Sequence, residues 1–369
     1  MKFSFRRITF VGFGLLASSI AAALKQSGEK IIVRAVSSPK TLVRAKELKL
    51  ADETFGYDEV EIWVEDSDFI LLCTPISVIL STLQKLSRIS PSKPVFVSDI
   101  GSTKAEICRA GALLKPPFHF VGSHPMAGSE KHSLEYSDPS IFENAYWFVC
   151  PQEGSPKEDY RFLSELVEFL GATEIVFPPE HHDGTVAWVS HMPQMASTSL
   201  AAGIPERLLD RGYQQFAGRA FRDMTRIAAS SWAMWKDIAE TNKTEILRAM
   251  DEYLDALKRT RDAVEKIPDE ESLHEIFLQG NSGRTSLFAP GKNAGNSFFQ
   301  LTVQLKDEPG TILSVLEPLA NAKINVRDIE LMKVRENIAG TLLIAFKTES
   351  QAEAARELLR KLNFEVTER

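Results

Sequence analysis

The sequence lacks three features that mark large classes of proteins. It has no excess of positive charge: 43 Lys and Arg stand against 50 Asp and Glu, for a formal net charge of -7. A nucleic-acid-binding protein would need a basic face. No apolar run approaches the roughly 20 residues that cross a bilayer. The basic start, residues 1–7, is followed by a short strand and glycines, not by the apolar core of a signal peptide. We therefore expect a cytoplasmic protein that binds neither nucleic acid nor membrane.

Cysteine is scarce as well. Cys73, Cys108 and Cys150 are far apart in apolar or helical surroundings, so we expect free thiols in a reducing compartment and no disulfide framework. Several histidines lie between residues 181 and 191, but no H-E-x-x-H spacing or nearby cysteine pair accompanies them. No metal site is expected. A length of 369 residues with 44% hydrophobic residues predicts two or three globular domains.

A glycine-rich turn follows the first apolar strand, Ile8 to Val11. The turn reads Gly12, Phe13, Gly14, Leu15, Leu16, Ala17, and a helix begins at Ser18. This is the G-x-G-x-x-A pattern, in which the first glycine makes the tight turn and the second lets a pyrophosphate approach the backbone. The helix N-terminus then faces the phosphates. The stretch predicts a dinucleotide site with contacts from residues 12–16.

Further apolar strands are expected at 31–36, 68–75, 94–99 and 145–150, alternating with helices. Continuous apolar strands ending at Pro or Gly are typical of a parallel sheet buried on both faces. Residues 1–178 are therefore predicted to form a Rossmann-type, doubly wound α/β domain. Thr74 and Pro75 would lie at the carboxyl edge of its sheet, where such folds bind ligands.

The second strand does not end in the Asp or Glu that commonly binds the ribose 2′-OH of NAD. It is followed by Ser37, Ser38 and Lys40, with Arg44 one turn later. Hydroxyls and cations there would accept a 2′-phosphate, so the sequence favours NADP within an NAD(P) site. The alternative is that Lys40 and Arg44 only decorate a solvated helix.

One histidine is set in a run of small, turn-forming residues from Val121 to Glu130. His124 lies between Gly122 and Gly128, as expected of a well-fixed base. Ser102 follows another strand and would be able to hydrogen-bond to the His124 ring if the two loops converge. The alternative roles are a turn residue for His124 and a helix N-cap for Ser102.

Helical periodicity replaces strands over residues 179–285. Residues 185–199 are largely apolar, which predicts a helix buried between domains or subunits. Arg219, Arg222 and Arg226 recur at helical spacing beside Trp232 and Trp235. Such a group can bind a carboxylate through a bidentate fork and stack on an unsaturated ring. The alternative is a solvated arginine face paired with nearby aspartates.

A third module follows a stretch of linker composition at 267–296. Residues 297–369 read strand, helix, strand, strand, helix, strand. This βαββαβ order predicts a small ferredoxin-like sandwich, which we expect to bind and regulate rather than catalyse.

Together these motifs resemble the prephenate/arogenate dehydrogenase family of tyrosine biosynthesis, followed by an ACT domain. The matching stretches lie at residues 12–19, 99–104, 122–130, 182–193, 221–228 and 234–235, and the ACT pattern at 307–310 and 324–325. The resemblance implies a Rossmann domain (1–178), a helical substrate and dimerisation domain (179–285) and a regulatory ACT domain (297–369) in a homodimer. It also implies oxidation of a cyclohexadienol, prephenate or arogenate, with loss of carbon dioxide and hydride transfer to NAD(P). The product would be 4-hydroxyphenylpyruvate or tyrosine.

The resemblance further implies roles for single residues. His124 would take the substrate hydroxyl proton, Ser102 would orient the imidazole, and Arg226 would bind the ring carboxylate. The remaining substrate-binding residues would be Ser129, Glu130, His191, Gln194, Arg219 and Trp235. An aromatic amino acid, tyrosine above all, would bind the ACT domain near Asp307, Gly310 and Asn325.

Two departures from the family pattern concern the head group of the substrate. Many relatives carry His at the position of Gln194 and glycine at that of Arg219. The changes are compatible with arogenate or with a 4-amino analogue of prephenate. Two other functions stay open: a different NAD(P)-dependent hydroxyacid or imine oxidoreductase, and a non-catalytic sensor of NADP and amino acids. The first typically uses a Lys base on the first long helix after the sheet, and residues 183–199 contain none.

Overall fold

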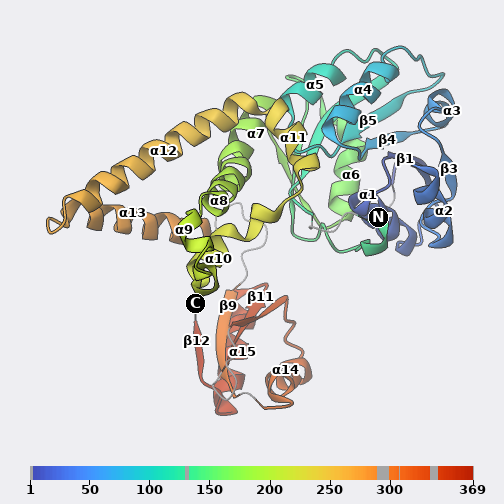
Figure 1. The fold of residues 1–369 in the computed structure, drawn as a ribbon. Helices are drawn as coiled ribbons and strands as arrows, with labels where there is room; N and C mark the ends of the chain where they lie inside the picture. Colours follow the sequence, from blue (N-terminus) through green and yellow to red (C-terminus); the bar gives the residue numbers. More distant parts are fainter. Residues whose placement is uncertain (1–2, 129–132, 289–298, 307, 333–339, 369) are drawn as a thin grey trace. The chain divides into compact units, whose positions relative to one another are not determined.

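The computed structural model describes residues 3–128, 133–288, 299–306, 308–332 and 340–368. The chain forms two compact units, residues 1–265 and residues 266–369 (Figure 1). Within the described residues, no helix combines the length and the apolar composition that a membrane crossing requires.

An eight-stranded sheet organises the first unit. In chain order its strands are β1 (Arg7–Val11), β2 (Ile32–Val36), β3 (Glu53–Phe55), β4 (Phe69–Leu72), β5 (Val95–Asp99), β6 (Phe118–Pro125), β7 (Tyr146–Cys150) and β8 (Thr173–Val176). Their order in the sheet is β3-β2-β1-β4-β5-β6-β7-β8. Neighbours are parallel except β6 and β7, which are antiparallel. The strand order reverses between β1 and β4, and such a switch point is where open α/β sheets bind ligands.

Helices cover both faces of this sheet, as the apolar strands predicted. They are α1 (Leu15–Gln26), α2 (Pro39–Glu47), α3 (Val60–Glu65), α4 (Ile76–Leu86), α5 (Ala105–Gly111) and α6 (Arg161–Phe169). Two hydrophobic clusters result. On β4, Phe69 and Leu71 belong to one cluster, and Ile70 and Leu72 belong to the other. Since neighbouring side chains point to opposite faces, each cluster fills one face of the sheet. The predicted doubly wound fold is confirmed.

The strand that carries His124 corrects an expectation. Residues 121–130 were expected to be turn-forming, but His124 lies near the end of β6. Its backbone is opposite Phe148 in the antiparallel pairing with β7. Small residues are needed here for packing rather than for a turn, because a Cβ on Gly122 would lie 2.4 Å from Cys108 Sγ.

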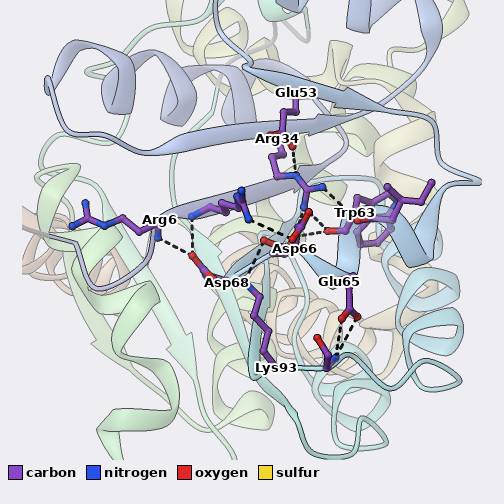
Figure 2. Close-up of polar contacts among 12 residues, drawn as sticks. Arg6, Arg34, Glu53, Trp63, Glu65, Asp66, Asp68 and Lys93 are labelled. Carbon is purple, nitrogen blue, oxygen red and sulfur yellow. Dashed lines mark hydrogen bonds and ion pairs between the residues drawn. The ribbon is translucent and has the colours of Figure 1, made fainter.

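A buried guanidinium anchors the edge of the sheet beside β2. Arg34 is 1% exposed and donates to Glu53 Oε2 at 2.9 Å and to the Trp63 carbonyl at 2.8 Å (Figure 2). The second bond satisfies a carbonyl at the C-terminal end of α3, where helices leave carbonyls without partners. Below it, Asp68 accepts from the backbone N–H groups of Arg6 and Arg7. These contacts fix β2 between β1, β3 and α3.

The helical part of the first unit contains α7 (Pro179–Val186), a π-helical turn (Ala187–His191), α8 (Met192–Ala202), α9 (Glu206–Leu209), α10 (Arg219–Thr225), a 3₁₀ turn (Arg226–Ala229), α11 (Trp232–Thr241) and α12 (Lys243–Glu265). The prediction of one continuous helix over 185–199 is wrong, because the π turn interrupts it. Trp188 and Val189 are exposed in the single chain, so burial of this segment between subunits stays a prediction. Pro193 has no N–H to donate to Val189, and the helix widens just before it.

The second unit holds helix α13 (Glu271–Phe288) and a four-stranded sheet. The sheet and its helices are β9 (Phe299–Leu305), α14 (Thr311–Asn321), β10 (Asp328–Met332), β11 (Gly340–Phe346), α15 (Glu349–Lys361) and β12 (Val366–Glu368). The strand order is β10-β11-β9-β12, with all neighbours antiparallel. This is the ferredoxin-like sandwich predicted for 297–369. The expected linker at 267–296 contains α13, because helix-forming residues over 271–279 outweigh Gly280 and Gly283.

Candidate active site

A cavity of about 540 Å³ opens at the carboxyl ends of β1, β4, β5 and β6. The start of α11 closes its far side through Ser231, Met234 and Asp237. Seven predicted site residues meet there: Gly14, Leu15, Leu16, Thr74, Pro75, Ser102 and His124. The glycine-rich turn, the strand ends and His124 therefore line one cavity.

The glycine turn fits a dinucleotide. Gly12 has φ +91°, and a Cβ there would lie 2.6 Å from Thr74 Cγ2 and 2.8 Å from the Cys73 carbonyl carbon. Gly14 is the N-cap residue of α1, so the backbone N–H groups of the first helical turn are free for a phosphate. Thr74 Oγ1 is buried and has no hydrogen-bond partner in the described part of the chain. A buried hydroxyl without a partner beside this cavity is what a bound polar group would satisfy.

The end of β2 carries hydroxyls and a free cation. Ser37 is buried, and Ser38 Oγ lies 3.0 Å from Thr41 Oγ1. Lys40 is exposed, with no ion pair to any residue that the structure describes. Arg44 is different: it forms ion pairs with Glu47 at 3.0 Å and with Glu135 at 3.4 Å. Its charge is therefore already balanced.

His124 is the first member of a hydrogen-bonded chain of three side chains. Its Nδ1 lies 2.9 Å from Nε2 of His182, and Nδ1 of His182 lies 2.8 Å from Oδ1 of Asp183. An ionised carboxylate can only accept, so His182 donates from Nδ1 and accepts at Nε2. His124 then donates from Nδ1, which leaves its Nε2 unprotonated. Since His124 lines the cavity, this geometry makes it a base.

Burial keeps both imidazoles neutral. Burial lowers the pKa of His124 well below its ordinary range, and the neighbouring His182, Lys104 and His191 act in the same direction. Burial also lowers the pKa of His182, against the opposing hydrogen bond from Asp183. A neutral His124 is ready to accept a proton at neutral pH.

Ser102 lines the same cavity as His124, as the sequence predicted. The hydrogen bonds among the described residues include none between the two, so the orienting role of Ser102 stays a prediction. Nor does Ser102 cap α5, since the carboxylate of Asp183 accepts from the backbone N–H groups of Lys104 and Ala105 at 2.6 and 2.9 Å. Asp183, with His182, thus fills both roles that the sequence suggested for Ser102.

A buried ion pair fixes the loop that carries Ser102. Lys104 Nζ contacts the carboxylate of Asp99 and donates to the Ser123 carbonyl at 2.8 Å. Both charged side chains are fully buried. Removing one partner of such a pair typically costs about 3–5 kcal/mol, because the other charge is left buried. The pair holds the ends of β5 and β6 together.

The predicted substrate-binding residues divide into a buried and an exposed group. His191 accepts from Asn242 Nδ2 at Nδ1 (3.1 Å) and meets the Trp235 ring edge-on, with centroids 5.7 Å apart. Burial lowers the pKa of His191 to about 4. Gln194 donates to the Ile227 carbonyl at 2.8 Å. This contact anchors the turn that begins at Arg226.

Neither the buried nor the exposed group is among the residues that line the cavity. Arg226 is exposed, and no described residue forms an ion pair with it. Arg219 is also exposed and pairs with Asp223 at 3.3 Å. This pairing agrees with the alternative prediction of a solvated arginine face paired with nearby aspartates. Ser129 and Glu130 lie outside the described residues.

Sequence reasoning missed the role of His182 and Asp183. The pair was recognised as a family motif, and its histidine was considered only as a metal ligand. The usable signal was the adjacent His-Asp at the start of the first helix after the sheet, because a carboxylate next to an imidazole is a common way to fix its tautomer.

Comparisons with known proteins identify the family of this chain. The model of the prephenate dehydrogenase nucleotide-binding domain matches residues 20–176, and that of the prephenate dehydrogenase dimerization domain matches residues 178–279. Prephenate dehydrogenase from Bacillus subtilis (strain 168) is 32% identical over 357 residues, covering 95% of this chain and 95% of that protein.

Two solved structures extend the comparison. Prephenate dehydrogenase from A. aeolicus, in complex with hydroxyphenyl propionate and NAD+, is 27% identical with a TM-score of 0.71, covering 78% of this chain and 100% of that chain. Arogenate dehydrogenase from Synechocystis is 29% identical with a TM-score of 0.65, covering 76% of this chain and 99% of that chain. The chain belongs to the prephenate dehydrogenase family.

Proposed function

We propose that this chain catalyses the oxidative decarboxylation of prephenate or arogenate with NAD(P), in tyrosine biosynthesis. The observation that carries the proposal is His124, which lines the same cavity as Gly14 and Thr74 and whose Nδ1 contact with His182 leaves Nε2 as the unprotonated nitrogen. The cavity thus joins a base to a dinucleotide cradle. The similar proteins named above, a prephenate and an arogenate dehydrogenase, support the substrate class.

In this reaction the carbinol C–H bond breaks and its electron pair leaves as hydride, which the nicotinamide accepts when bound. His124 Nε2 takes the hydroxyl proton as the C–H bond breaks. The bond to the ring carboxylate then breaks, carbon dioxide departs, and its electron pair makes the ring aromatic with a phenolate oxygen, to which His124 returns the proton. Because aromatisation drives the reaction, the protein contributes mainly orientation and this proton acceptor.

The substrate-binding roles follow from exposure and charge. Arg226, which has no ion pair within the described residues, would bind the ring carboxylate through its fork of donors. His191 and Trp235 would form a rigid wall, with Gln194 holding the turn of Arg226 in place. Arg219 would add a second carboxylate contact after leaving Asp223. Ser129 and Glu130 follow Gly128, which lines the cavity.

For the cofactor we infer a preference for NADP. Ser37, Ser38 and Lys40 stand where an NAD-specific site commonly has a carboxylate. Lys40 offers a charge without an ion pair in the described part of the chain, whereas Arg44 is held by two carboxylates. For the assembly we infer a homodimer formed by the helical part, in line with the description of the matching domain model.

For the second unit we infer an amino-acid effector site. A cavity of about 410 Å³ is lined by Asn325, Lys323 and the apolar side chains of Leu316, Leu319 and Ile329, among others. Gly310, with φ +88°, precedes α14, and Asp307 lies outside the described residues. A polar amide and a cation within an apolar wall suit an aromatic amino acid such as tyrosine.

The test is His124→Asn, assayed against prephenate and arogenate, each with NAD and NADP. We expect kcat to fall about 100- to 10,000-fold, the usual contribution of a general base, with cofactor binding unchanged. The wild-type assays also establish which substrate and which cofactor the chain prefers. Turnover at the wild-type rate in the variant would remove His124 from the reaction, and no turnover of either substrate by wild type would refute the proposed function.

A further inference from the structure

We propose that His182 is a positioning residue that fixes the tautomer of the base, holding the proton of His124 on Nδ1 so that Nε2 stays open to the substrate. The inference rests on the proposed role of His124. It assigns a function to the His182–Asp183 pair that packing alone does not require.

The chain of contacts has one consistent direction. Asp183 accepts three hydrogen bonds: from the backbone N–H groups of Lys104 and Ala105, and from His182 Nδ1 at 2.8 Å. The two backbone N–H groups can only donate, so the carboxylate acts as the acceptor in these contacts. As the acceptor, Asp183 leaves His182 with its proton on Nδ1. His182 Nε2 is therefore the acceptor for His124 Nδ1–H at 2.9 Å.

The surroundings keep the hydrogen bonds among Asp183, His182 and His124 in this direction. His182 is 0% exposed and Asp183 is 2% exposed, so water does not compete for their hydrogen bonds. The Phe148 ring lies edge-on to His182, with centroids 5.1 Å apart, and 6.5 Å from the centroid of His124. Lys104, the nearest cation, is already bound to Asp99 and the Ser123 carbonyl.

The ability of His124 to act as a base depends on the direction of these hydrogen bonds. A neutral imidazole carries one proton on either nitrogen, and its neighbours decide which. If His124 carried its proton on Nε2, the cavity would face a donor, and the substrate hydroxyl would have no acceptor. An ordered tautomer is therefore part of the activity, as with the aspartate of a Ser-His-Asp triad.

The experiment compares two substitutions of His182. His182→Phe keeps a ring of similar shape and removes the acceptor. His182→Gln places an amide oxygen near the former Nε2 and can still accept from His124. We expect kcat to fall about 10- to 100-fold in His182→Phe, as is typical when an orienting partner is lost, and to recover most of the wild-type value in His182→Gln.

A matched control lies on the same strand as His124. His119 of β6 stacks on Phe96 and pairs with Asp159 at 3.6 Å, with its side chain 36% exposed. His119→Gln should leave kcat unchanged. Cofactor KM and circular dichroism, measured on all variants, separate loss of the tautomer from loss of the fold.

A second measurement does not depend on turnover. Nitrogen-15 shifts of His124 should report the Nδ1–H tautomer in the wild type and in His182→Gln, and a mixture in His182→Phe. If His182→Phe kept both the wild-type kcat and the Nδ1–H tautomer, the inference would be overturned while His124 remained the base. If instead His124→Asn were fully active, the proposed function of the base would fail by itself.

Discussion

At the scale of single residues, Asp183 shows how few side chains hold the candidate site together. Its two oxygens bond to the backbone at the start of α5 and to His182. Its own carbonyl accepts from Asn242 Nδ2 at 2.9 Å, and the same amide donates to His191. A single residue thus connects the loop after β5, the base and the histidine of the π turn.

Arg226 is the residue on which substrate affinity should depend most. Replacing Arg226 with Ala removes a charge-assisted, bidentate contact worth about 1.5–3 kcal/mol. We expect substrate KM to rise about 10- to 100-fold, with the KM for the cofactor unchanged. Arg222→Ala is the matched control, because it removes the same charge one turn earlier on α10. Steady-state kinetics decide: an unchanged KM in Arg226→Ala would place the carboxylate elsewhere.

The sequence predicted residues whose role depends on local chemistry, and missed those whose role depends on distant contacts. The glycines, Thr74 and His124 meet at one cavity as expected, because strand ends in a parallel sheet share an edge. The sequence suggested Ser102 as the partner of His124, whereas the hydrogen bond in the structure is made with His182. His182 is 58 residues from His124, and no local pattern in the sequence indicates that the two rings meet.

At the scale of elements, long periodic segments were predictable and short or interrupted ones were not. The strands β1, β2, β4, β5 and β7 lie within a residue or two of expectation, apart from the C-terminal end of β4. Strands β3, β6 and β8 were not predicted. β6 contains Gly122, Ser123 and Pro125, which resemble a turn, and only its pairing with β5 and β7 makes it a strand.

Helix α2 should decide between the two cofactors. Lys40, which has no ion pair to another described residue, should bind a 2′-phosphate. We expect Lys40→Ala to raise the KM for NADP about tenfold, roughly the 1.4 kcal/mol of one charged contact, and to leave the KM for NAD unchanged. Arg44→Ala is the control on the same helix, since Glu47 and Glu135 already bind that guanidinium. Equal changes in the KM for NADP and in the KM for NAD would argue against a phosphate contact at Lys40.

At the scale of the whole molecule, fold class was predicted because the two units obey different and recognisable rules. Buried parallel strands separated by helices specify the first, and the βαββαβ order specifies the second. Boundaries were harder: α13 lies where the glycines and prolines suggested a linker. Turn residues inside a helix mislead because helix-forming neighbours outweigh them.

The second unit should bind an aromatic amino acid at the cavity lined by Asn325. We expect tyrosine to release or absorb heat in calorimetry with the full chain, and Asn325→Ala to weaken that binding at least tenfold by removing an amide that fixes the ligand. Glu349→Ala, an exposed change at the start of α15, serves as the control. Absence of heat with tyrosine, phenylalanine and tryptophan alike would leave this unit a structural module.

Acid should destabilise the molecule through its buried histidines. The pKa of His124, His182 and His191 is lowered in the folded chain, so below pH 6.5 the unfolded chain binds protons that the folded chain does not. The free energy of unfolding is therefore fully retained above pH 6.5 and falls as the pH falls. For His191, with a folded pKa of about 4, the loss amounts to about 3 kcal/mol at pH 4.

Urea unfolding at a series of pH values measures this loss directly. His191→Asn keeps an acceptor for Asn242 and removes the titrating ring, so its unfolding free energy should fall by about 3 kcal/mol less than that of the wild type between pH 7 and pH 4. His119→Gln, at a partly exposed ring, should follow the wild type. If the His191→Asn curve also ran parallel to the wild type, His191 would have to be protonated in the folded chain, and its contact with Asn242 would have to break on acidification.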